Sequence, residues 1–342
     1  MNLAFLGIYR EIGFDLGTAM TAVAMGESVQ FNEPSVVAVD SNTKKVIAVG
    51  DSADDMLGRT PDNITAICPI KNGVIADFEA SASMIKAFLK KASGKMPVIR
   101  PRIAVCVPGS ITDVERRAAI EAFTLAGAGN VYLIEEVTAA AIGAGLPIMS
   151  PQGSMIVNIG AGTTEVAVIS LGGIVAARSI RTGSAAMDNS IISYLRHQYS
   201  VTIGEKTAEE IKKEIGSASV QSNETSYDVR GRETATGLPK NVRVSPHEIR
   251  QAIAPMVDEI VAAVLDTLEE TPPELAADVL TSGITLAGGG ALLKGMGDVI
   301  ETATGIKTKL AKNPHECSAV GAYTALGEPA VLRRCEVGRV RR

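Results

Sequence analysis

Short apolar runs along the chain predict buried strands in both of its halves. Runs of about four to eight apolar residues bounded by glycine or polar turns are typical of such strands. In the first half they predict strands at Ile12–Asp15, Thr18–Met25, Ser35–Val39, Ile103–Val107 and Val131–Ile134. In the second half they predict strands at Ser154–Ile159, Thr164–Leu171, Ile174–Ile180 and Ile284–Leu286.

Other segments place apolar residues three and four positions apart, which is the spacing of an amphipathic helix. In Ala80–Lys91, Met84 and Phe88 share one face while Lys86 and Lys90 occupy the other. Further helices are predicted at Val114–Ala126, Val137–Gly145, Met187–Tyr199, Thr207–Ile215, Ser245–Leu268 and Leu292–Thr302. Strands and helices therefore alternate along much of the chain, as in an α/β protein.

Length and composition agree with an α/β protein of about two domains. The 342 residues are 46% hydrophobic but only 4% aromatic, which favours small side chains packed between helices and sheets. Residues 41–80 and 216–244 are polar and irregular, and we interpret them as inserted subdomains. The formal net charge of −5 gives no electrostatic argument for nucleic-acid binding.

Cysteines and histidines do not point to a metal or redox site. The four cysteines are scattered, without metal-ligand or redox spacing, so we expect a reduced cytosolic protein. The three histidines, His197, His247 and His315, are isolated in polar surroundings and are predicted to be surface residues. No apolar run is long enough to span a membrane, and Met1–Tyr9 lacks the basic start of a secretory signal.

Glycine-rich turns between predicted strands are the candidate chemistry. The turn at Asn158–Thr164 would expose backbone N–H groups to a phosphate, and Thr163 and Thr164 would add hydroxyl donors. Gly17-Thr18 repeats this pattern in the first half, and Gly288–Gly290 forms a third cluster. One such turn is usually only a turn. The repetition predicts a duplicated fold that closes on one phosphate chain from both sides.

Longer stretches carry a family resemblance. They include Asn32-Glu33-Pro34-Ser35-Val36-Val37, Gly73-Val74-Ile75-Ala76-Asp77-Phe78, Tyr132-Leu133-Ile134-Glu135-Glu136 and Thr163-Thr164-Glu165-Val166-Ala167-Val168-Ile169-Ser170-Leu171-Gly172-Gly173. From about Ile12 to Leu326 the chain resembles the actin/heat-shock-chaperone/sugar-kinase ATPase superfamily, and within it the MreB family of bacterial actins. The resemblance implies an α/β, actin-like ATPase fold: two related halves, each a mixed β-sheet flanked by helices, with a nucleotide cleft between them.

Domain limits follow from the same resemblance and from the predicted linker at Pro147–Gly153. Domain I would comprise residues 1–147 and 312–330, with a small inserted subdomain at about 33–78. Domain II would comprise residues 148–311, with an inserted subdomain at about 183–244. Residues 331–342 would form a basic, solvated C-terminal tail.

The resemblance also implies a site for ATP or ADP with Mg²⁺. It places Asp15 near the metal, through water, gives Glu136 the task of orienting the attacking water, and includes Asn158 among the catalytic residues. The cofactor-binding residues it implies are Gly17, Thr18, Ala19, Met20, Gly160, Ala161, Gly162, Thr163, Thr164, Glu209, Lys212, Lys213, Gly288, Gly289 and Gly290. Lys71 would lie near the γ-phosphate. Such a site acts by positioning and charge neutralisation.

Departures from the family pattern cluster at the phosphate end. Asn158 stands where the family has Asp, Ala161 where it has Gly, and Met20 where it has Asn. The change from Asp to Asn removes a charge that would help to hold hydrated Mg²⁺. Three functions therefore stay open: a filament-forming ATPase, a nucleotide-binding scaffold filament with weak or no hydrolysis, and a small-molecule kinase of the same fold. The kinase is disfavoured because no long substrate-domain insertion is present.

The partners implied by the family are copies of the chain itself, as a homopolymer with paired protofilaments, and the inner face of the cytoplasmic membrane. Membrane proteins of cell-wall elongation are implied as further partners, with a role in rod shape and wall synthesis. Met1–Tyr9 and the loop at 96–99 are the candidate membrane anchors, the loop having basic neighbours such as Arg100 and Arg102.

Overall fold

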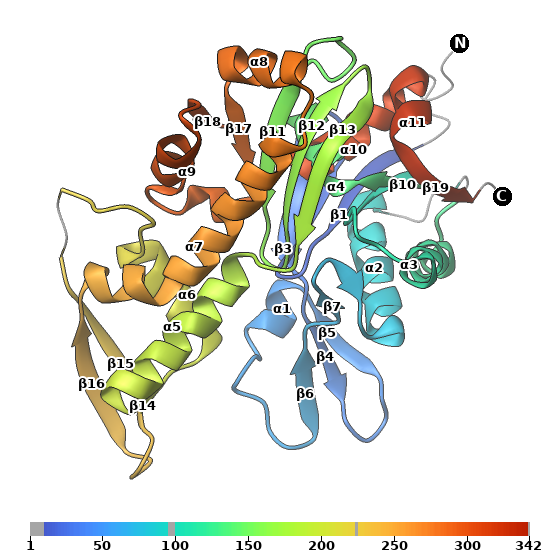
Figure 1. Ribbon diagram of the computed structural model, residues 1–342. Helices are drawn as coiled ribbons and strands as arrows, with labels where there is room; N and C mark the ends of the chain where they lie inside the picture. The colour runs from blue at the N-terminus through green and yellow to red at the C-terminus, as the bar shows by residue number, and fades with distance from the viewer. Residues whose placement is uncertain (1–9, 95–99, 223–224, 341–342) are drawn as a thin grey trace.

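The computed structural model describes residues 10–94, 100–222 and 225–340. Both candidate membrane anchors, Met1–Tyr9 and the loop at 96–99, lie outside these residues. Two large sheets stand side by side, and each extends into a smaller subdomain at the lower end of the molecule in Figure 1. No helix within the described residues is long and apolar enough to cross a membrane.

The first sheet has six strands in the order β19-β10-β9-β1-β2-β3. Their bounds are β1 (Glu11–Leu16), β2 (Met20–Ala24), β3 (Val29–Pro34), β9 (Arg102–Val107), β10 (Asn130–Glu135) and β19 (Glu336–Val340). β1 forms an antiparallel hairpin with β2 and pairs in parallel with β9. The buried Ile12 and Phe14 of β1 belong to a core on which α2 (Phe78–Ser93) and α3 (Asp113–Ala126) pack.

The second sheet repeats this arrangement with five strands in the order β13-β12-β11-β17-β18. Their bounds are β11 (Ser154–Ile159), β12 (Thr164–Ser170), β13 (Gly173–Ile180), β17 (Ile284–Ala287) and β18 (Thr308–Leu310). β11 forms an antiparallel hairpin with β12 and pairs in parallel with β17, as β1 does with β2 and β9. The prediction of two related halves with mixed sheets is therefore confirmed. The limits of the two domains stay a prediction.

Helices rich in small residues fill the space between the sheets. α4 (Glu136–Gly143) packs on α10 (Cys317–Gly327), and their core cluster also takes side chains from β9, β10, β11 and β12. A Cβ on Gly321 would lie 1.7 Å from the Ala139 carbonyl oxygen, and one on Gly143 would lie 1.9 Å from that of Cys317. Only glycine at these two positions allows the helix backbones to approach so closely.

The remaining elements cover the second sheet and build the subdomains. The helices on the second sheet and its subdomain are α5 (Ser184–Tyr199), α6 (Glu205–Ile215), α7 (Pro246–Glu269), α8 (Pro273–Ser282) and α9 (Met296–Thr304). One subdomain contains α1 (Asp51–Asp54) with β4 (Val37–Asp40), β5 (Val46–Val49) and β6 (Ile64–Ile67), followed by the hairpin of β7 (Ile70–Lys71) and β8 (Val74–Ile75). The other contains β14 (Val201–Thr202), β15 (Tyr227–Glu233) and β16 (Pro239–Val244).

Two local predictions are corrected. The helix predicted at Leu292–Thr302 is a 3₁₀ turn at Gly289–Leu292 followed by α9, because Gly295 takes a left-handed φ of 74° between them. The solvated tail predicted for 331–342 is wrong for residues 331–340. These residues complete α11 (Pro329–Cys335) and form β19, which pairs with β10. α8, α10 and α11 are helices that the periodicity did not predict.

The buried face of α11 gives a test of this C-terminal packing. Leu332 is 6% exposed in the core cluster between the sheets, whereas its neighbour Arg333 is exposed. We expect Leu332→Ala to lower the free energy of unfolding by about 2–5 kcal/mol, because it leaves a cavity. Arg333→Ala, the matched control, should change it by about 0.5 kcal/mol or less. Urea denaturation measures both, and equal small effects would mean that the segment is a solvated tail.

Candidate functional site

A cavity of about 450 Å³ lies between the two halves, and residues from both halves line it. Almost every residue that the sequence marks as a nucleotide contact lies on its wall. These are Asp15, Gly17, Thr18, Ala19, Met20, Glu136, Asn158, Gly160, Ala161, Gly162, Thr163, Glu209, Lys212, Lys213, Gly288, Gly289 and Gly290. The structure thus brings segments about 270 residues apart in the sequence to one site.

Thr164 and Lys71 do not line this cavity. Thr164 is fully buried, and its hydroxyl donates a hydrogen bond to the Thr182 carbonyl at 2.7 Å. Its assignment as a cofactor contact is therefore corrected. Side chains alternate along β12, so Thr164 lies on the same side as Val166, in the core of the second half. Lys71 is exposed on β7, while the neighbouring Gly73 reaches the cavity.

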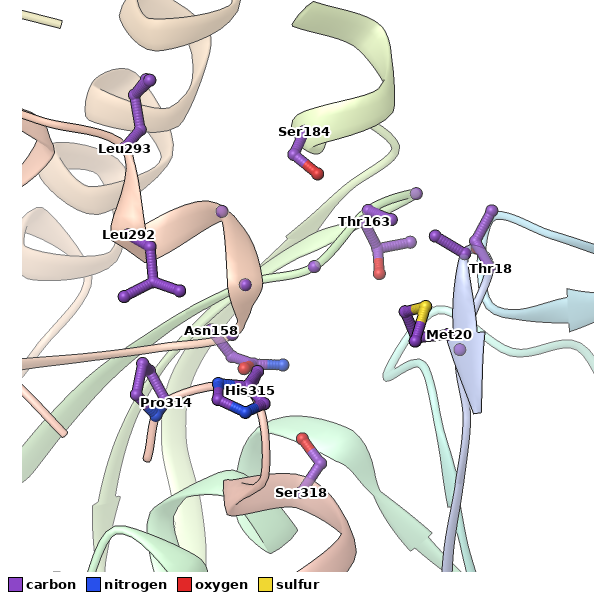
Figure 2. Close-up of a pocket in the computed structure, with 18 of the residues that line it drawn as sticks. Thr18, Met20, Asn158, Thr163, Ser184, Leu292, Leu293, Pro314, His315 and Ser318 are labelled. Carbon is purple, nitrogen blue, oxygen red and sulfur yellow. The ribbon is translucent and has the colours of Figure 1, made fainter. Parts of the chain in front are cut away.

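The two glycine turns meet at one end of the cavity. A Cβ on Gly162 would lie 2.4 Å from the Thr18 hydroxyl oxygen and 2.9 Å from the Asn72 Cα. Thr18 Oγ1 in turn accepts a hydrogen bond from the Gly73 N–H at 2.9 Å. Figure 2 shows Thr18 and Thr163 approaching each other from the two halves, with Met20 beside them. Backbone of both halves therefore converges where a phosphate chain would lie.

Gly288, Gly289 and Gly290 form the opposite wall of the cavity, together with apolar neighbours. Gly288 has a φ of 82°, and its N–H donates to the Pro314 carbonyl at 2.7 Å. Leu292, Pro314 and His315 stand around this end of the cavity in Figure 2. Apolar and flat groups suit a purine base more than a phosphate. His315 was predicted to be a surface residue; it is half-exposed and lies on the cavity wall.

The charged residues of α6 are partly engaged within the protein. Lys212 is 8% exposed, and its Nζ donates to Asp188 Oδ2 at 2.7 Å and to the Ser184 carbonyl at 2.9 Å. Glu209 and Lys213 form an ion pair at 2.7 Å. Lys212 thus fixes α5 to α6 at the cavity wall, whereas Glu209 and Lys213 keep more freedom because their pair is exposed.

Three acidic side chains gather near the end of the cavity where the two glycine turns meet. They are Asp15 on β1, Glu136 at the start of α4 and Glu165 on β12. Burial, followed by the charges of Glu136 and Glu165, raises the pKa of Asp15 well above its usual value. Burial also raises the pKa of Glu136, against the hydrogen bond from Asn158. Burial and then Glu136 raise the pKa of Glu165 to about 8.

Asn158 connects this acidic cluster across the cleft. Its Nδ2 donates a hydrogen bond to Glu136 Oε1 at 2.8 Å, from β11 of one half to α4 of the other. Its Oδ1 is buried and has no hydrogen-bond partner within the described protein. The side chain thus holds an unpartnered carbonyl oxygen close to the Glu136 carboxyl group. A hydrated cation or an ordered water would satisfy that oxygen.

Glu165 is the main site residue that sequence reasoning missed. It is 2% exposed in β12, between Thr164 and Val166, which are fully buried. The available signal was a carboxylate inside a run predicted to be buried, since such groups need specific partners. Glu165 lies behind the cavity wall and does not line the cavity itself. Asn32, Leu293 and Ser318 line the cavity and were not predicted, because they come from segments without a phosphate pattern.

The raised pKa of Glu165 predicts how stability depends on pH. Its pKa is about 8 in the folded protein and about 4.5 without the fold, so the folded state holds more protons between these values. The free energy of unfolding should therefore fall as pH rises from about 5 to about 8. Glu165→Gln should flatten this slope in urea titrations without nucleotide. Asp15 and Glu136 leave a residual slope of the same sign, and an unchanged slope would contradict the assignment.

Known protein families and relatives agree with the resemblance found in the sequence. The MreB/Mbl protein family matches residues 9–334. The chain is 47% identical over 329 residues to the cell shape-determining protein MreB of Escherichia coli (strain K12), which covers 94% of this chain and 95% of that protein. It is 44% identical over 318 residues to the cell shape-determining protein Mbl of Bacillus subtilis (strain 168), with 93% and 96% covered.

Solved structures of similar proteins have the same fold as this chain. The crystal structure of MreB5 of Spiroplasma citri bound to ADP superimposes with a TM-score of 0.88 at 37% identity, covering 96% of this chain and 99% of that one. The duplicated mixed sheets described above are accordingly those of the actin-like fold that the sequence predicts. Family, relatives and fold lead to one conclusion: this chain belongs to the MreB/Mbl family of cell shape-determining proteins.

Proposed function

We propose that this protein binds ATP and ADP in the cavity between its halves and assembles with copies of itself into filaments that act in cell-shape control. The observation that carries the proposal is the contact of the two halves at the glycine turns, where a Cβ on Gly162 would lie 2.4 Å from the Thr18 hydroxyl oxygen and 2.9 Å from the Asn72 Cα. Support comes from the MreB5 structures, which were solved with ADP and with AMPPNP bound.

Mg²⁺ belongs to the same proposal. The fit rests on the buried, unpartnered Oδ1 of Asn158 beside Asp15 and Glu136. Within the described residues no group of three or more His, Cys, Asp or Glu side chains could hold a metal. Mg²⁺ would therefore be shared between the phosphates and these few oxygens, with Asp15 and Asn158 on the protein side. When bound, it would neutralise charge on the phosphates.

For hydrolysis, we propose that Glu136 orients the attacking water. It lies at the N-terminus of α4, and Gly160 of the second phosphate turn adjoins its Oε1. Asn158 fixes that same oxygen. Replacing the family's Asp by Asn leaves less negative charge for the metal, so a scaffold filament that binds nucleotide but hydrolyses it slowly is the second candidate. A small-molecule kinase of this fold is the third and has the least support.

Location and further partners are proposals of the same kind. We place the filament in the cytoplasm, at the inner face of the cytoplasmic membrane, with membrane proteins of cell-wall elongation as partners. Their support is the family, because the candidate anchors lie outside the described residues. Many weak membrane contacts in one filament would add to firm attachment.

Binding and assembly can be tested together on the full chain. Mg-ATP at a 100-fold excess over its Kd should stabilise the protein by about 2.7 kcal/mol and raise its Tm. Under the same conditions the protein should pellet in sedimentation assays and form filaments in electron microscopy. The control is Gly162→Val, whose side chain would press on Thr18. An unchanged Tm would exclude the nucleotide site, and monomers at every salt concentration would exclude assembly.

Asn158→Asp separates the first candidate from the second. We expect phosphate release to rise about tenfold, because a carboxylate at this position favours the metal and the developing charge. Without nucleotide the same change should lower the free energy of unfolding by about 1–3 kcal/mol, since the Asn158–Glu136 hydrogen bond becomes a contact between two acids.

The control for that experiment is Asn158→Ala, which removes the hydrogen bond without adding charge. It should destabilise the free protein but leave phosphate release low. Equal or slower phosphate release in Asn158→Asp than in the wild type would mean that Asn158 does not limit hydrolysis. Glu136→Ala should abolish whatever release remains in either background.

A further inference from the structure

Glu165 belongs to the second sheet, yet its hydrogen bonds reach across to the first half of the molecule. Its Oε1 accepts a hydrogen bond from the Gly109 N–H at 2.6 Å, in the loop between β9 and α3. Its Oε2 accepts one from the Val137 N–H at 3.1 Å. A third bond, from Ser179 Oγ at 3.2 Å, comes from β13 of its own sheet. Both bonds that cross the cleft thus end on backbone amides.

The Val137 amide has a particular place in the fold. It belongs to the first turn of α4, where backbone N–H groups have no partner inside the helix. Such groups are usually satisfied by a capping side chain that precedes the helix. Here the preceding residue, Glu135, makes no such bond. Glu165 supplies the acceptor instead.

Glu165 and Asn158 act on consecutive residues of α4. They lie directly opposite each other in the antiparallel register of β11 and β12. Asn158 holds the carboxyl group of Glu136, and Glu165 holds the N–H of the next residue, Val137. One cross-strand pair of the second half therefore binds the start of α4, in the first half, through two hydrogen bonds.

We propose that Glu165 is a positioning residue: with Asn158 it clamps the first turn of α4, so that the Glu136 carboxyl group keeps its place relative to the glycine turn at Gly160–Gly162. This role rests on the proposed function of Glu136 in hydrolysis. The physical basis is that a few tenths of an ångström at a water-orienting group change the rate of reaction more than they change ligand binding.

The clamp needs both carboxyl oxygens. Each accepts a backbone N–H, and the two donors lie on different segments of the first half. Glutamine has the same shape but only one acceptor oxygen, so one of the two amides would face its NH₂ group. Alanine would leave both amides without a partner. Ser179→Ala removes a bond to Oε1 that does not cross the cleft, which makes it the matched control.

The first measurement is amide hydrogen exchange in the nucleotide-free full chain, which does not depend on turnover. In Glu165→Ala the amides at the start of α4 should exchange about tenfold faster, as expected for loss of a helix cap. Glu165→Gln, which keeps the packing, should speed exchange at the start of α4 or at Gly109 but not at both. Ser179→Ala should leave both segments as in the wild type.

The second measurement separates positioning from binding. Phosphate release at saturating Mg-ATP should fall about tenfold in Glu165→Ala, while the Kd of a non-hydrolysable ATP analogue changes less than about threefold. Glu165→Gln should lie between Glu165→Ala and the wild type. A merely structural role would instead weaken binding and turnover together, in step with a loss of stability.

Two outcomes would overturn the proposal. One is wild-type exchange at the start of α4 in both Glu165 variants. The other is a parallel loss of affinity and turnover in Glu165→Gln while its Tm is unchanged. If the wild type releases no phosphate at all, the hydrolytic function proposed above fails, and the exchange experiment still decides whether the clamp exists.

Discussion

The crossing of α4 and α10 sets the distance between the two halves, and the geometry of the cavity depends on it. Glycines at 143 and 321 let the two helix backbones touch, and the surrounding core draws side chains from both sheets. Close-packed helices of this kind transmit displacement because the interior has little free volume. The same helix α4 begins with Glu136 in the cavity, so the packing that joins the halves also determines where the Glu136 carboxyl group lies.

Charge is the second constraint, because carboxyl groups from both halves lie close together in the cleft. Asp15, Glu136 and Glu165 come together from three different elements, and burial works against ionising all of them. Neutral hydrogen-bond donors bind these carboxyl groups: two backbone amides donate to Glu165, and the Asn158 side-chain amide donates to Glu136. This arrangement leaves the cluster able to accept positive charge, which is what a metal–nucleotide complex would bring.

Local signals in the sequence predicted the strands and the glycine turns, and the family resemblance supplied the fold and most of the remaining residues of the cavity wall. Repeated glycine turns such as Gly160–Gly162 and Gly288–Gly290 are visible in the sequence, and short apolar runs such as Ser154–Ile159 mark the strands next to them. The ends of elements and the C-terminal segment were harder, since α10 is rich in small residues without a clear polar face and α11 is only 7 residues long. Residues like His315 and Glu165 owe their roles to contacts between distant segments, which periodicity does not contain.

Asn158 gains a physical explanation from the structure that its place in the sequence did not have. As a departure from the family pattern, Asn158 removes a charge that would help to hold Mg²⁺. In the folded protein its amide donates to Glu136, and a carboxylate there would instead add a fourth acid to a partly buried cluster of three. Asn158 therefore stabilises the ligand-free cleft and keeps Glu136 oriented, at the expense of charge available to a metal. The two effects act in opposite directions on the proposed reaction, and their balance would decide whether the proposed filament hydrolyses its nucleotide or only holds it.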